Sequence, residues 1–127
     1  MTAFLWESVK GHVCLGESEL SGGLRAVKCS ETRGVKPKGD STLAALFGPG
    51  TLNEGARVVM VADPGEKVVS VKYQKQKMDW KFIRTLSPAT SGRDVYYVTL
   101  PDFPDDWLNV AVRVGGQEKA DRLWLGW

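Results

Sequence analysis

Aromatic and basic residues alternate with valines near the end of the chain, in the stretch WLNVAVRVGGQEKADRLW (residues 107–124). Either Gly115 and Gly116 form a two-residue turn or GGQE, residues 115–118, forms a four-residue one, and both make this stretch an antiparallel hairpin. Both registers place Trp107 and Trp124 on the face opposite the valines, and the two-residue turn places them directly opposite each other. Indole rings beside hydrogen-bond donors suit the C–H face and the hydroxyl groups of a sugar ring. The candidate ligand-binding residues are therefore Trp107, Trp124, Asn109, Arg113 and Arg122.

A tryptophan pair on neighbouring strands also has a purely structural interpretation. Opposite indole rings can stabilise a hairpin by packing against each other, and the N-terminal segment around Trp6 could cover them. The same alternation places Trp127 on the valine face, where it would join the core. The sequence leaves both interpretations of Trp107 and Trp124 open.

The two cysteines, Cys14 and Cys29, are a second pair whose spacing could produce chemistry. If Ser21 and Gly22 form a two-residue turn, the register places Cys14 directly opposite Cys29, within reach of a disulfide. A wider loop would leave the register free, and the two residues would then be buried thiols. We predict the disulfide, which would close a short loop and stabilise the fold by about 2–3 kcal/mol.

Compartment and membrane association follow from related signals. A disulfide favours an oxidising compartment, so we expect a secreted or extracytoplasmic protein. The first residues, MTAFLWESVK, contain no basic segment followed by an apolar stretch, so no signal peptide is expected in this chain. No apolar run approaches the roughly 20 residues that cross a bilayer, and we expect no membrane insertion.

No catalytic residue, metal site or cofactor is predicted, and we expect no enzyme. His12 and Cys14 lie at i and i+2 of an expected strand, about 6–7 Å apart, which is too far for a nucleophile and its base. The acidic loop Asp102–Asp106, with Asp121, could hold Ca²⁺, but it lacks EF-hand spacing and suits a solvated turn better. No glycine-rich loop opens a helix after a strand, so phosphate binding is not indicated.

Basic residues are interleaved with aromatic residues in the segment KYQKQKMDWKFIR, residues 72–84. Such a pattern can bind single-stranded nucleic acid through stacking and phosphate contacts. Lys75 and Lys77, however, fall at the expected tip of a hairpin, where lysines keep a strand edge soluble. The net charge of +2 is also small for a dedicated nucleic-acid binder. A solvated turn is thus the preferred interpretation of this segment, nucleic acid is not the expected partner, and binding of an anionic polysaccharide or a nucleic acid stays a secondary option.

Hydrophobic residues recur mainly with a period of two, which predicts strands. Turn signals recur every roughly 8–12 residues, so we expect an all-β fold, an antiparallel β-sandwich of about eight or nine strands. Pro64 and Gly65 predict a type II turn between two of these strands. The expected strands cover residues 3–9, 12–17, 24–29, 56–63, 67–73, 79–86, 94–100 and 107–114, and a last strand follows the glycine turn and continues the alternation to Trp127.

The segment between the third and fourth of these strands is less regular. TRGVKPKGD, residues 32–40, is typical of a loop. Asp40 or Ser41 could cap one short helix near residues 41–47, and Gly48 with Pro49 would end it. The length and the absence of a linker composition predict a single domain over residues 1–127.

The stretch from about Ala56 to Trp127, with VVSVKYQ, Trp80, DVYYVTLP and LNVAVRV, resembles immunoglobulin-like sandwich modules. The resemblance implies an immunoglobulin-like sandwich. Modules that bind cell walls or starch often show this pattern. The alternation also selects the inward face of the expected strands. The predicted core residues are Val69, Val71, Tyr73, Leu108, Val110, Val112, Leu123 and Leu125.

These residues together predict a noncatalytic binding module that takes a carbohydrate or cell-wall polymer on exposed aromatic side chains. The alternative is a protein-interaction domain, such as a secreted effector, an inhibitor or a structural subunit. Tryptophan, tyrosine and arginine are enriched in the hot spots of protein interfaces, so the same residues would serve that function. The expected partner is a glycan or a protein, and the sequence sets no oligomeric state.

Overall fold

The computed structural model of the chain describes residues 2–8, 11–18, 24–31, 43–51, 55–87, 92–102 and 104–125. The expected loop 32–40 and Trp127 lie outside these residues. Within them the fold is all-β, with eleven strands in antiparallel sheets. The predicted all-β antiparallel sandwich is confirmed, with eleven strands in place of the eight or nine expected.

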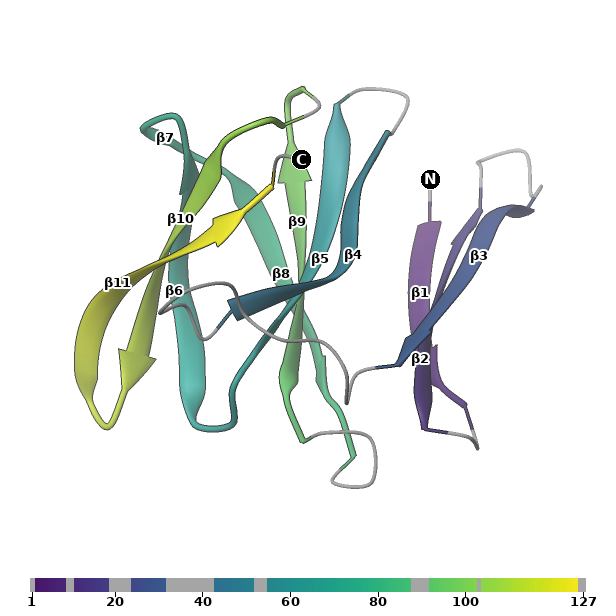
Figure 1. The fold of residues 1–127 in the computed structure, drawn as a ribbon, viewed down its shortest axis with the longest axis horizontal. Coiled ribbons are helices and arrows are strands. Elements are labelled where there is room, and N and C mark those ends of the chain that lie inside the picture. Colours follow the sequence, from purple (N-terminus) through teal and green to yellow (C-terminus); the bar gives the residue numbers. More distant parts are fainter. Residues whose placement is uncertain are drawn as a thin grey trace.

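The strands form three sheets, which we name by their position (Figure 1). The N-terminal sheet has the order β1-β2-β3, with β1 at Thr2–Glu7, β2 at His12–Ser18 and β3 at Leu24–Glu31. The middle sheet has the order β4-β5-β9-β8, with β4 at Leu43–Thr51, β5 at Ala56–Ala62, β9 at Asp94–Leu100 and β8 at Asp79–Thr85. The C-terminal sheet has the order β11-β10-β6-β7, with β11 at Gln117–Trp124, β10 at Trp107–Val114, β6 at Glu66–Tyr73 and β7 at Gln76–Lys77.

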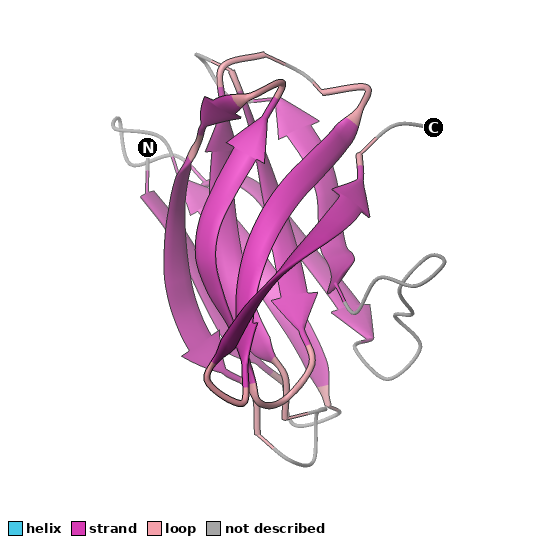
Figure 2. Ribbon diagram, turned by 90° about the vertical axis from the view of Figure 1, so that its left-hand side faces the viewer, coloured by secondary structure: helices cyan, strands magenta, loops and turns pink. Residues whose placement is uncertain are grey.

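The sheets are stacked as three layers, with the middle sheet between the other two (Figure 1). Figure 2 views the stack from the side of the C-terminal sheet. Val58 and Met60 of the middle sheet belong to a core shared with the C-terminal sheet. Val59 and Val61 point the other way and pack with Leu15 of the N-terminal sheet. The fold therefore has two hydrophobic cores, one on each face of the middle sheet.

The strand β5 shows why the middle sheet needs both neighbours. All seven of its residues, ARVVMVA, are buried. Successive side chains of a strand point to opposite faces, so a fully buried strand must be covered on both. This requirement explains why the sequence there is a continuous apolar run, whereas β6 and β10 alternate.

Two tight turns that the sequence predicts are present. Pro64–Gly65 connects β5 to β6, where the N–H of Glu66 donates to the carbonyl oxygen of Asp63 at 3.1 Å and Gly65 has a φ of 88°. Gly115–Gly116 connects β10 to β11, with φ values of 57° and 81°. A type I′ hairpin requires positive φ at both central residues, which glycine adopts without steric cost.

The predicted helix near residues 41–47 is wrong, because its described residues belong to β4 at the edge of the middle sheet. Leu43 faces the core shared with the C-terminal sheet, and Leu46 faces the N-terminal sheet. A short apolar run does not distinguish a buried strand from a helix, and here packing on both faces overrides the helix propensity of leucine and alanine. Pro49 is tolerated because an edge strand has an unpaired side.

Seven of the eight predicted core residues are buried, and Val69 is the exception. The pairing of β6 with β10 shifts register between Ala111 and Val112, which interrupts the alternation of β6. Val68 is consequently buried, whereas Val69 is half-buried. A bulge adds one residue to one strand, so the positions beyond it change face. The confirmed core residues are Val71, Tyr73, Leu108, Val110, Val112, Leu123 and Leu125.

The predicted disulfide between Cys14 and Cys29 is present, and the two residues are directly opposite each other in β2 and β3. Their Cα atoms are 4.0 Å apart. The predicted register holds as far as Glu17 and shifts at Ser18. Residues 19–23, which include the predicted two-residue turn, lie outside the described part of the chain. The disulfide thus joins the central strand of the N-terminal sheet to an edge strand.

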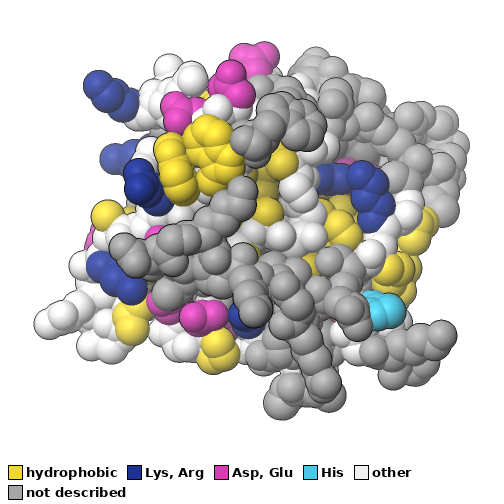
Figure 3. Space-filling view, viewed as in Figure 1, with side chains coloured by type: hydrophobic (Ala, Val, Ile, Leu, Met, Phe, Trp, Pro, Cys, Tyr) yellow, Lys and Arg dark blue, Asp and Glu magenta, His cyan; other side chains and the backbone are white. Residues whose placement is uncertain are grey.

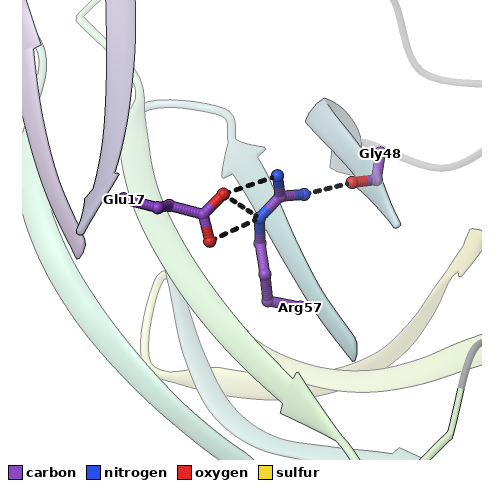
Figure 4. Close-up of polar contacts among 3 residues, drawn as sticks. All are labelled: Glu17, Gly48 and Arg57. Atoms are coloured by element: carbon purple, nitrogen blue, oxygen red, sulfur yellow. Dashed lines mark hydrogen bonds and ion pairs between the residues drawn. The ribbon is translucent and has the colours of Figure 1, made fainter. Parts of the chain in front are cut away.

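One buried ion pair joins the N-terminal sheet to the middle sheet (Figure 4). Arg57 of β5 is 3% exposed and Glu17 of β2 is 5% exposed, and Arg57 Nη2 lies 3.0 Å from Glu17 Oε1. Arg57 Nη1 also donates to the carbonyl oxygen of Gly48 in β4 at 2.8 Å. A Cβ atom on Gly50 would lie 2.5 Å from Arg57 Nη1, so this glycine leaves space for the guanidinium. The GPG segment, interpreted from sequence as a helix end, accommodates a buried arginine.

We expect Glu17→Ala to lower the free energy of unfolding by about 3–5 kcal/mol, because it leaves the Arg57 guanidinium buried without a counter-charge. The double variant Glu17→Leu/Arg57→Met should recover most of that loss, since an apolar pair needs no desolvation of charge. Urea unfolding curves measure both effects. Arg84→Met is the control, because Arg84 pairs with Glu7 at a more exposed position and should cost about 0–1 kcal/mol. A loss in Glu17→Ala no larger than that in Arg84→Met would contradict this assignment.

Candidate binding surface

The C-terminal hairpin brings Trp107 and Trp124 together on the outer face of the C-terminal sheet. They are directly opposite each other, with ring centroids 5.1 Å apart and ring planes inclined by 58°. Both side chains are half-buried. Figure 3 shows hydrophobic side chains over the upper ends of β10 and β11, with basic side chains beside them and acidic side chains above them. The predicted register is confirmed, but the two indoles are inclined to each other and do not form one flat platform.

Arg122 lies over the ring of Trp107. Its guanidinium carbon is 4.1 Å from the ring centroid, which is a cation–π contact. Stacking of this kind orients the guanidinium plane and leaves its N–H edge for a bidentate contact with an oxyanion. One face of the Trp107 ring is therefore in contact with a cation, which reduces the apolar area that a neutral sugar could use.

A row of polar residues crosses the same face of the sheet. Arg122 of β11 is opposite Asn109 of β10, Asn109 is opposite Lys72 of β6, and Lys72 is opposite Lys77 of β7. All four residues are exposed. Neighbouring strands are about 4.8 Å apart, so the row spans about 14 Å. We call this row, together with the tryptophan pair, the C-terminal binding surface.

The cations of this surface, Lys72, Lys77 and Arg122, form no ion pair with a carboxylate in the part of the chain that the structure describes. Like charges on adjacent strands repel each other, although solvent and salt screen the repulsion at an exposed surface. An anionic ligand would remove this repulsion on binding.

Arg113 is the predicted site residue that lies away from the others. It is six positions from Trp107 along β10, about 20 Å away, and opposite Glu118 of β11. Sequence reasoning in turn did not include Lys72 and Lys77 in the surface. The alternation of KVVSVKY indicates that Lys72 points outward, but the pairing of β6 with β10 joins segments that are distant in sequence. The predicted site residues that the structure brings together are Trp107, Trp124, Asn109 and Arg122.

The other candidate chemistry from the sequence finds little support in the described residues. Cys14 is bonded to Cys29 and cannot act as a nucleophile with His12. Nowhere in the described ranges do three His, Cys, Asp or Glu side chains gather as metal ligands, the described acidic loop residues included. Over those same ranges no helix has the length and apolar character needed to cross a membrane.

A polar cluster at the start of β9 links the sheets of the sandwich. The carboxylate of Asp94, which is 3% exposed, accepts hydrogen bonds from Lys67 Nζ at 2.6 Å and from Thr85 Oγ1 at 2.5 Å. The hydrogen bond with Asp94 raises the pKa of Lys67 above its ordinary value. Burial raises the pKa of Tyr96, whose hydroxyl oxygen accepts the N–H of Val68 at 3.2 Å. These groups connect the middle sheet to β6 and leave Tyr96 too buried to contact a ligand.

The N-terminal sheet also exposes apolar side chains on its outer face. Phe4 and Trp6 of β1 are 45% and 36% exposed, and their rings stack with centroids 6.0 Å apart. The Phe4 ring covers Gly16 of β2, where a Cβ atom would lie 2.5 Å from it. Val27 of β3, opposite Gly16, is 48% exposed. We call Phe4, Trp6 and Val27 the N-terminal apolar patch.

Comparison with known proteins assigns no family to this chain. No protein-family model matches it, and neither a curated protein nor a solved structure was found that matches it. The functional proposals below rest on the geometry and the charges of the described residues.

We expect Trp107→Ala and Trp124→Ala to lower the melting temperature by less than about 10 °C, because half-buried side chains lose less packing than core side chains. Leu108→Ala, at a fully buried position of the same strand, is the matched control and should lower it further. Thermal unfolding of the three variants measures these shifts. If either tryptophan variant melted as low as Leu108→Ala, the tryptophan pair would belong to the hydrophobic core. The C-terminal binding surface would then have no aromatic residues to offer a ligand.

Proposed function

We propose that this chain is a noncatalytic binding module that takes an acidic polysaccharide on its C-terminal binding surface. The observation that carries the proposal is the row of Arg122, Lys72 and Lys77 beside the tryptophan pair; none of these three cations forms an ion pair with a described carboxylate. A chain of sugars that bear carboxylates or sulfates offers repeated anions to these cations and apolar C–H faces to the indoles. Asn109, within the row, supplies an amide donor and acceptor for a hydroxyl group.

Arg122 favours an acidic ligand over a neutral one. Its guanidinium stacks on Trp107, so a neutral sugar would have to displace it to use that ring face. A carboxylate or sulfate could instead bind the guanidinium edge while the stack stays intact. The stack of Arg122 on Trp107 therefore reduces the apolar area available to a neutral sugar and, at the same time, provides an oriented guanidinium for an anion.

A nucleic acid fits the surface less well than an acidic polysaccharide. Binding of single strands depends on bases stacking on open aromatic faces. Here one face of Trp107 contacts Arg122, and the Trp124 ring is inclined by 58° to that of Trp107. The net charge of the whole chain is only +2, which gives little long-range attraction for a phosphate backbone.

We also propose that β4 to β11 form an immunoglobulin-like sandwich. Immunoglobulin domains place strands A, B, E and D in one sheet and C, F and G, often with C′, in the other. If β4 is strand A, the order β4-β5-β9-β8 corresponds to A-B-E-D, and β11-β10-β6-β7 corresponds to G-F-C-C′. Two antibody hallmarks differ: Trp80 lies on β8 and not on the third strand, and the disulfide lies in the N-terminal sheet. The proposal concerns strand order alone.

A secreted or extracytoplasmic location agrees with this function. Disulfides persist in oxidising compartments, and the Cys14–Cys29 bond supports such a location. Polymers of acidic sugars are abundant outside cells, where a binding module of this kind would meet them.

We expect the wild-type protein to bind a polyuronate such as polygalacturonate at least tenfold more tightly than a neutral glucan of similar length. Lys72→Gln should weaken polyuronate binding about fivefold, which corresponds to about 1 kcal/mol. Raising the salt concentration from about 50 mM to about 500 mM should weaken it as well, since exposed charges are screened. Isothermal titration calorimetry gives the affinities.

Arg113→Gln is the matched control for Lys72→Gln. It removes one charge from the same sheet face, but about 20 Å from the tryptophan pair, and should leave the affinity unchanged. An equal loss of polyuronate affinity in both variants would show that binding depends on net charge alone, which would contradict a defined site. Equal affinity for the neutral glucan would contradict an acidic ligand, and tighter binding of single-stranded DNA would assign the surface to nucleic acid.

Protein interaction through the N-terminal apolar patch is a second candidate function. Three large apolar side chains are exposed together on one sheet face, and contiguous exposed apolar surface is typical of interaction sites. Phenylalanine and tryptophan are also enriched in protein interfaces. The patch lies on the opposite side of the molecule from the C-terminal binding surface, so the two functions do not exclude each other.

We expect Phe4→Ser/Trp6→Ser to stop retention of a partner protein from an extract of the native source, because the variant removes the stacked rings. Val114→Ser is the control, since Val114 is 38% exposed on another sheet. Affinity capture followed by mass spectrometry identifies what each protein retains. Identical captured proteins from wild type and the double variant would rule out the patch as the interface.

A further inference from the structure

The two edge strands β1 and β8 border a cleft between the N-terminal sheet and the middle sheet. The cleft contains a cavity of about 340 Å³. This is within the range of about 300–1,000 Å³ that small-molecule sites occupy, and such sites are mostly apolar with few polar groups. The apolar side chains that line it include Leu5, Leu15, Val59, Ile83 and Tyr97.

An ion pair closes one end of the cleft. Glu7 of β1 pairs with Arg84 of β8 at 3.0 Å, and its Oε1 accepts hydrogen bonds from the N–H and the hydroxyl of Ser87. These contacts hold the two edge strands together just beyond Leu5 and Ile83. The cleft therefore cannot extend further in that direction.

The buried pair of Arg57 and Glu17 lies toward the other end of the cleft. Ala3, which lines the cavity, is opposite Glu17 in the pairing of β1 with β2. Thr99, which also lines it, is opposite Arg57 in the pairing of β9 with β5. The cleft is thus bounded at both ends by interactions between layers and can open only between β1 and β8.

Lys81 of β8 lines the cavity and is exposed. It is the only charged side chain among the described residues that line the cavity. No carboxylate of those residues forms an ion pair with it. An apolar cleft with one uncompensated cation at its opening complements a molecule that has an apolar chain and an anionic head.

We propose that this cleft binds a single-chain amphiphile with an anionic head, such as a long-chain carboxylate. The aliphatic chain lies in the cavity against Leu5, Ile83 and Tyr97, and the head contacts the ammonium group of Lys81. The hydroxyl group of Thr99 provides a further donor near the cleft. The proposal is independent of polysaccharide binding, because the C-terminal binding surface lies on a different sheet.

The contribution of the chain can be separated from that of the head by titrating alkyl carboxylates of increasing length, below the concentrations at which they form micelles. Each added methylene should tighten binding about fourfold until the cavity is filled. The neutral alcohol of the same chain length should bind at least tenfold more weakly. Isothermal titration calorimetry, with displacement of a fluorescent fatty-acid analogue, measures both series.

Two variants locate the ligand. Lys81→Gln should reduce carboxylate affinity to that of the alcohol and leave alcohol affinity unchanged. Ile83→Phe, which extends into the cavity from its opening, should weaken both ligands at least tenfold. Thermal unfolding checks that Ile83→Phe is folded. Lys81→Gln changes an exposed position, so it tests the proposal even if Ile83→Phe does not fold. Lys75→Gln removes an equal charge from the β6–β7 turn and should change nothing.

Three results would overturn the proposal. The first is equal affinity of the wild-type protein for the carboxylate and the alcohol. The second is carboxylate binding that Lys81→Gln leaves unchanged. The third is an absence of binding to free carboxylates, including the case in which the protein binds anionic phospholipid vesicles instead.

Discussion

Burial of the middle sheet on both faces is the constraint on which the rest of the structure depends. All seven residues of β5 are buried, so a layer must exclude water from each side of this strand. The C-terminal sheet covers one face and the N-terminal sheet covers the other. Because side chains alternate between the faces of a strand, each covering sheet presents its remaining side chains to solvent. The C-terminal binding surface and the N-terminal apolar patch lie on these two outward faces.

A charge inside that buried strand sets further requirements on its neighbours. The Arg57 guanidinium is accommodated there because Glu17 of the N-terminal sheet supplies a carboxylate and Gly48 of β4 supplies a carbonyl oxygen. Gly50 must lack a side chain for the guanidinium to fit. One arginine thereby constrains residues in two other strands, and it ties the N-terminal layer to the middle one at a defined position, where apolar contacts alone would tolerate sliding.

Sequence reasoning was successful where local interactions determine the structure. Gly115–Gly116 sets the hairpin register, so the opposition of Trp107 and Trp124 follows from residues close in sequence. Long-range contacts determine what was missed. The apolar run of β4 favours a helix locally and is extended only because both of its faces are buried. The bulge that turns Val69 out of the core and the pairing that adds Lys72 to the C-terminal binding surface both depend on β10, which lies far from β6 in sequence.

The edge strand β3 is attached differently from the strands beside it. Its side chains Val27, Lys28 and Cys29 are exposed, so the hydrogen bonds to β2 and the disulfide to Cys14 hold these residues in place, and burial contributes little. Reduction of the disulfide would leave Val27, Lys28 and Cys29 attached to β2 mainly by backbone hydrogen bonds, and wherever these open, the backbone N–H and C=O groups of β2 would meet solvent. An uncovered strand edge is a template for pairing with strands of other molecules. The Cys14–Cys29 bond thus does more than close a loop: it fastens the strand that covers this edge of β2.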